Sequence, residues 1–134
     1  MRTLHAIVVV AALSLGCGKK TAGDCQKLVQ LVGPQHASLT AAFQRSDQPA
    51  SELETQAQGW EKAAQELSAA TFETEEVKGL ATQFAGVLTN AAKIRRGLAA
   101  AVSDPAALTQ AMAQATSFMV EETKAKAAVD MTCR

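Results

Sequence analysis

Three cysteines and two histidines are the residues of this chain best suited to covalent or metal chemistry. Cys17 follows an apolar run near the N-terminus, while Cys25 and Cys133 lie at opposite ends of the remaining sequence. A cysteine attacks as a thiolate, which usually requires a neighbouring base. His36 is the one histidine beyond the apolar run, so a catalytic cysteine–histidine pair is disfavoured.

Other catalytic and cofactor motifs are also missing from the sequence. It has no glycine-rich phosphate loop, no G-x-S-x-G elbow and no Ser/His/Asp set. It also lacks C-x-x-C-H, H-E-x-x-H and paired Glu-x-x-His patterns. The cluster of Glu73, Glu75 and Glu76 offers too few wrapped oxygen ligands for calcium. We therefore predict a protein that is not an enzyme and that holds no metal or cofactor.

The N-terminal residues carry the most specific signal in the chain. Residues 6–15 form an apolar run that is too short to cross a bilayer, which needs roughly 20 residues, but is typical of a secretory signal. Leu13-Ser14-Leu15-Gly16 then leads directly into Cys17. This order resembles the bacterial lipobox, in which a leucine, small or apolar residues and a glycine or alanine precede a lipidated cysteine. The alternative is an ordinary signal peptide cleaved near Gly16 or Gly18.

The resemblance to bacterial lipoproteins implies a division of the chain into three segments. They are a signal peptide at 1–16, a lipidated cysteine with its tether at 17–23, and a domain at 24–134. The resemblance implies acylation of Cys17, and two or more acyl chains anchor a protein stably to a membrane. Gly18 is not the aspartate that retains enteric lipoproteins at the inner membrane. We therefore expect an anchor in the outer membrane, with the domain facing the periplasm.

The elements that must position the remaining residues are helices. The chain is rich in alanine, and its apolar residues recur at steps of three and four. The expected helices cover 24–45 (opened by Asp24 and kinked at Gly33-Pro34), 49–70, 74–101 and 104–132. Arg95 and Arg96 are expected to face the negative pole of the third helix. Short connections between helices of similar length predict an all-α, antiparallel, up-down-up-down four-helix bundle.

An even number of antiparallel helices returns the chain to the end at which it began. This arrangement places Cys25, in the first turn of the bundle, beside Cys133 in its last turn, and both lie on apolar stripes. With lipid on Cys17, these two cysteines form an even pair in a compartment that permits disulfides. We predict a Cys25–Cys133 bond that closes the bundle; two unrelated thiols are the alternative.

The same folding predicts one layer that contains several functional side chains, namely His36, Trp60, Met119 and Glu122. Such a layer could line a ligand pocket or, with a methionine, bind haem or a metal. A structural interpretation is simpler, because a lone His beside a Glu usually forms an ion pair and Met at helical spacing usually fills a core.

Two functions remain after these exclusions. Thirteen basic and thirteen acidic residues give no net charge, and no basic stripe is interleaved with aromatics, which argues against nucleic acid as a partner. The first function is a lipid-anchored structural or protein-interaction module that contacts the bilayer and an envelope protein. The alternative is a carrier of a small apolar ligand or cofactor between the helices. Alanine-rich stripes leave little void, which favours the first. In length and composition, the domain resembles small uncharacterised helical lipoproteins of Gram-negative envelopes, which implies no activity.

Overall fold

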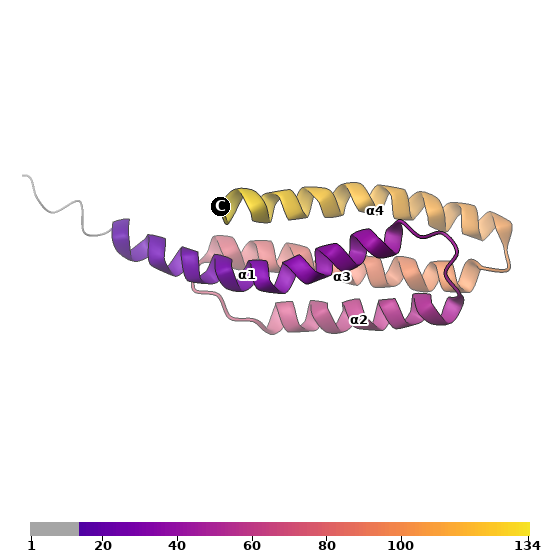
Figure 1. Ribbon diagram of the computed structural model, residues 1–134, viewed down its shortest axis with the longest axis horizontal. Coiled ribbons are helices and arrows are strands. Elements are labelled where there is room, and N and C mark those ends of the chain that lie inside the picture. Colours follow the sequence, from indigo (N-terminus) through magenta and orange to yellow (C-terminus); the bar gives the residue numbers. More distant parts are fainter. Residues whose placement is uncertain (1–13) are drawn as a thin grey trace, which may run out of the picture.

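Residues 14–134 are described in the computed structural model, with side chains described from residue 18 onward. The four helices are α1 (Ser14–Phe43), α2 (Ala50–Ala69), α3 (Glu75–Ala101) and α4 (Pro105–Thr132). They alternate in direction and are joined by short connections (Figure 1). Strands are absent from the described residues, so the predicted all-α, up-down-up-down four-helix bundle is confirmed. The predicted signal peptide (1–16) lies almost wholly outside the described residues, as does the side chain of Cys17.

Helices α2, α3 and α4 lie side by side in one layer, and α1 lies over this layer. α3 packs along α2 on one side and along α4 on the other, and α1 contacts all three. Figure 1 shows α1 in front of α3, with α2 and α4 on either side. α3 is therefore the central helix, and its buried residues outnumber those of α2 or α4.

The first helix begins earlier than the sequence predicts. α1 starts at Ser14, so the residues expected to form a tether continue the helix into the bundle. Glycine at 18 and 23 disfavours a helix by only about 1 kcal/mol per residue, and no proline interrupts the stretch. The expectation that Asp24 opens this helix was wrong, because Asp24 lies well inside it.

α1 changes direction along its length (Figure 1), and it contains Pro34. The helix is continuous through Gly33-Pro34, and Figure 1 shows it bending near its middle. Proline removes one backbone hydrogen bond and crowds the preceding turn, which accounts for the predicted kink. The bend turns the second half of α1 toward α4 (Figure 1).

The core is continuous along the bundle and is dominated by aliphatic and aromatic side chains. Its fully buried members include Leu28, Val32, Leu39, Val77, Phe84, Leu88, Phe118 and Val129. Phe43, at the end of α1, stacks on Trp60 of α2 at 5.9 Å and on Phe118 of α4 at 4.9 Å between ring centroids. This aromatic cluster joins three helices.

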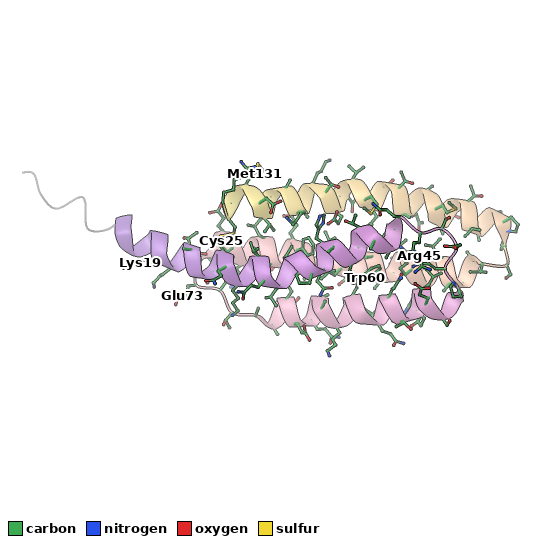
Figure 2. All side chains as sticks on the ribbon, viewed as in Figure 1. Lys19, Cys25, Arg45, Trp60, Glu73 and Met131 are labelled. Atoms are coloured by element: carbon green, nitrogen blue, oxygen red, sulfur yellow. A yellow bond between two sulfur atoms is a disulfide. The ribbon has the colours of Figure 1, made fainter. Side chains whose placement is uncertain are left out.

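The end of the bundle that contains the α2–α3 connection is called the proximal end, and the opposite end is called the distal end. At the proximal end, Cys25 and Cys133 are joined by a disulfide, as predicted, with their Cα atoms 5.1 Å apart. Figure 2 places Cys25, Glu73 and Met131 at this end and Arg45 toward the other. Within the described residues, no helix combines the length and the apolar character that a membrane span needs.

Candidate functional site

The predicted layer of His36, Trp60, Met119 and Glu122 is assembled only in part. His36 Nδ1 on α1 contacts Glu122 Oε1 on α4. The Glu122 side chain is 1% exposed, whereas that of His36 is 37% exposed. A carboxylate so deeply buried needs a polar partner, and the imidazole supplies it. This contact corresponds to the structural interpretation, in which the pair joins two helices.

Trp60 and Met119 have other surroundings. Trp60 Nε1 donates a hydrogen bond to Ser38 Oγ at 3.2 Å, and its ring stacks on Phe43. Met119 instead lines a cleft at the distal end, whose lining includes neither Trp60 nor the His36–Glu122 pair. The four residues therefore do not surround a common ligand. Among the described side chains, no group of three or more His, Cys, Asp or Glu residues is placed to hold a metal ion.

The distal cleft exists because α1 is shorter than its neighbours at this end. α1 stops at Phe43, while α3 and α4 continue past it (Figure 1). The connection at 44–49 crosses the gap in place of another helical turn. The cleft has a volume of about 440 Å³, within the usual range for small-molecule sites. The sequence predicted little empty space, because alanine lines the contacts between helix faces. The cleft forms instead beyond the end of a helix, which that argument did not consider.

The walls of this cleft are mostly apolar. Its aliphatic and methionine side chains are Leu53, Leu98, Val102, Leu108, Met112 and Met119. Arg45, Asp47 and Arg95 are its charged residues. Arg45 forms an ion pair with Glu52 of α2, so Arg95 and Asp47 are the charged lining residues without an ion pair in the described structure.

Arg95 is the most unusual residue of the cleft. It belongs to α3 and is only 3% exposed. Its guanidinium carbon lies 4.0 Å from the centroid of the Phe43 ring, a distance typical of a cation–π contact. Nη1 donates a hydrogen bond to Gln48 Oε1 at 2.9 Å. Nε and Nη2 are buried and have no hydrogen-bond partner in the described part of the chain.

The electrostatic surroundings of Arg95 do not compensate for its burial. Burial lowers the pKa of Arg95 to about 10, although the charge of Glu52 opposes this shift. The guanidinium therefore stays charged at neutral pH. The Glu52 carboxylate is itself hydrogen-bonded to Arg45, Gln48 and Gln56 and not to Arg95. Each unpartnered buried donor costs about 1–3 kcal/mol, so the structure retains a destabilising group at this position.

The neighbouring Arg96, unlike Arg95, is paired with carboxylates. Arg96 donates to Glu54 Oε1 at 3.1 Å and to Glu61 Oε2 at 2.8 Å, and so joins α3 to α2. These hydrogen bonds raise the pKa of Arg96 and lower that of Glu61. The sequence placed both arginines near the negative pole of their helix, but neither lies in the last turn of α3, and each has tertiary contacts instead.

Sequence reasoning missed Arg95 although the sequence contained a signal. Arg95 lies four residues after Ala91 and seven after Leu88, on the stripe that α3 turns toward the core. A charged residue at such a position is a candidate for a functional role. Comparisons with known proteins add no relative, since no protein-family model, curated protein or solved structure matches this chain.

Proposed function

We propose that this protein is a lipid-anchored component of the bacterial cell envelope that acts as a non-enzymatic structural or protein-interaction module. The lipobox-like sequence that ends at Cys17 is the basis of this proposal. The main structural support is the Cys25–Cys133 disulfide, which lies about two helical turns beyond Cys17. A disulfide suits the oxidising compartment to which such a signal directs a protein.

The proposed anchor gives the bundle an orientation. Lipid on Cys17 holds the proximal end near the bilayer and leaves the distal connections, at 44–49 and 102–104, facing away from it. Gly18 after the cysteine favours the outer membrane, with the bundle in the periplasm. The proposed partners are the bilayer and an envelope protein that contacts the distal surface.

A Cys17→Ser substitution tests the anchor. We expect the unmodified chain to fractionate with membranes and to have the mass of a cleaved, acylated protein. The Cys17→Ser chain should move to the soluble fraction and lack the acyl mass. Cys25→Ser is the matched control, because it removes a nearby cysteine and should leave the acyl mass unchanged. Membrane attachment of Cys17→Ser without acyl mass would contradict the proposal.

A second candidate function, the carrier of a small apolar ligand, is favoured by the distal cleft. The volume of about 440 Å³ and the apolar lining fit a small molecule. Native mass spectrometry and a visible spectrum of protein from its natural source test this function. A co-purifying small molecule supports a carrier, whereas a clear spectrum without an added mass leaves the interaction module.

A further inference from the structure

We propose that the distal cleft binds a small monocarboxylate with an apolar tail, and that Arg95 holds the carboxylate. This inference rests on the carrier function given above as the second candidate, and it names the class of ligand. Three features support it: the free edge of a buried guanidinium, the apolar walls of the cleft, and the charge balance of its lining.

The first feature is the geometry of the unpartnered nitrogens. Nε and the adjacent Nη2 form one edge of a guanidinium, and their N–H bonds point the same way. The spacing of these two donors matches the two oxygens of a carboxylate, which binds them as a bidentate pair. In Arg95 this edge has no partner among residues 14–134, whereas Nη1 is already engaged by Gln48.

The second feature is the lining that would receive the tail. Leu98, Leu108, Met112 and Met119 come from two helices that continue past the end of α1. Methionine side chains are flexible and adapt to ligands of irregular shape. Met112 is 51% exposed and Val102 is 55% exposed, so apolar side chains also form the mouth of the cleft.

The third feature is the charge of the cleft. Glu52 neutralises Arg45, and Asp47 is an acidic lining residue. Arg95 is left as the buried cation, and its single charge suits a monoanion. Asp47 repels any anion, but it repels a phosphate ester more strongly than a carboxylate because the phosphate carries more negative charge. The lining therefore favours a carboxylate over a phosphate.

Binding requires a local rearrangement at the connection between α1 and α2. The Nε and Nη2 atoms are covered in this structure, so the carboxylate reaches them only after a side chain moves. Gln48 lies on this connection, lines the cleft and holds Nη1. Rotation of the Gln48 side chain releases the guanidinium and lets its free edge turn toward the ligand.

The experiment compares two probes that differ only in the head group. Decanoate and decanol are titrated into the full-length chain that carries Cys17→Ser, and heats of binding are measured by calorimetry. Fluorescence of Trp60, the single tryptophan, is a second readout because its ring stacks on Phe43, a lining residue. We expect decanoate to bind at least about tenfold more tightly than decanol, as a charge-assisted bidentate contact predicts.

Three variants locate the carboxylate contact. Arg95→Met should lose this preference and bind both probes with the affinity of decanol. Arg95→Lys keeps the charge but not the paired donors, so it should bind decanoate with intermediate affinity; it also tests the proposal if Arg95→Met fails to fold. Arg96→Met is the matched control and should bind decanoate as the parent chain does, because Arg96 is paired with Glu54 and Glu61.

The outcomes separate this inference from the carrier function. Equal binding of decanoate and decanol by the parent chain and Arg95→Met would keep the carrier and overturn the carboxylate site. Binding of neither probe would overturn both. Tighter binding of decyl phosphate than of decanoate would assign the cleft to phosphate esters, which also overturns the proposal. An equal loss in Arg96→Met would show that general positive charge, and not Arg95, attracts the acid.

Discussion

Asp24 of α1 accepts hydrogen bonds from both the backbone N–H and the hydroxyl of Thr74, at 2.7 and 2.8 Å. The same carboxylate oxygen accepts the N–H of Glu73 at 2.8 Å. Thr74 is the N-cap of α3, but its own side chain makes no capping bond. Asp24 therefore places a negative charge at the start of α3 from another helix, where backbone donors and the helix dipole favour an anion.

The Asp24 contact predicts an acid-sensitive contribution to stability. Burial opposes ionisation of Asp24, but the hydrogen bonds from Thr74 and Glu73 and the charge of Lys27 outweigh it and hold its pKa below the usual 3.8. A depressed pKa gives stability that is fully present above the unfolded-state pKa and is lost as the pH falls through the folded one. Asp24→Asn should therefore lower the Tm at neutral pH and weaken the dependence on pH below about 4. Thermal unfolding monitored by circular dichroism measures both effects.

Asp130→Asn is the control for this experiment, because Asp130 is exposed and pairs with Lys126, one turn earlier on α4. It should change the Tm much less than Asp24→Asn does. Equal effects of the two substitutions would show that the contact with Thr74 contributes nothing beyond an ordinary surface charge.

The disulfide predicts a large effect of reduction. Cys25 and Cys133 are separated by 108 residues, so their bond restricts almost the entire unfolded chain. The chain-entropy description assigns a loop of this size roughly 4–5 kcal/mol of stabilisation as an upper value. Urea unfolding with and without reductant should show a lower midpoint for the reduced protein. A Cys25→Ser/Cys133→Ser chain should match the reduced protein and be insensitive to reductant; unchanged unfolding after verified reduction would contradict the expectation.

Removing one partner of the His36–Glu122 pair should destabilise the protein more than replacing both partners with apolar residues. His36→Ala leaves the Glu122 carboxylate buried without its partner, and we expect a loss of about 3 kcal/mol in the free energy of unfolding. His36→Leu combined with Glu122→Met replaces both groups with apolar ones and should cost less than about 1 kcal/mol. Urea denaturation of the single and double variants measures this difference. A double variant as unstable as His36→Ala would show that packing, and not the unpaired carboxylate, causes the loss.

Arg95 predicts a conflict between stability and ligand binding. Arg95→Met removes a buried cation with two unpartnered nitrogens, so we expect the free energy of unfolding to rise by about 1–2 kcal/mol. The same substitution should abolish the preference for carboxylates. Groups that destabilise a fold are often retained for function. A destabilised Arg95→Met chain would instead show that the contact with Phe43 outweighs the cost of burial.

Sequence patterns predicted the helices, their alternation and the disulfide because these depend on regular spacing. Asp104, for example, accepts the N–H groups of Ala106 and Ala107 and caps α4, at the residue where the fourth helix was expected to begin. The layer formed by α2, α3 and α4 was not predictable in this way, since stripes show which face is buried but not which neighbour covers it. The spacing of residues likewise predicted correctly that His36 lies next to Glu122. It predicted wrongly that Trp60 and Met119 share a layer with this pair.

The distal cleft was missed for a related reason. Its existence depends on where α1 ends relative to α3 and α4, and helix ends are the least regular part of a sequence pattern. Asp24 was misread similarly: as an aspartate before an apolar stripe it resembles a cap of its own helix, but it serves the helix that follows two connections later.

The unbroken course of α1 from Ser14 past Cys25 has a mechanical consequence. With lipid on Cys17, about 10 Å of rigid helix separates the lipid headgroups from the disulfide. An extended tether would instead have allowed the bundle to change its orientation relative to the membrane. The cleft then opens about 30 Å farther out, because Arg95 lies 20 residues after the start of α3. A ligand cannot diffuse sideways out of the bilayer into a site at that height. The proposed acid would therefore arrive through water, and its tail would have to be short enough to dissolve.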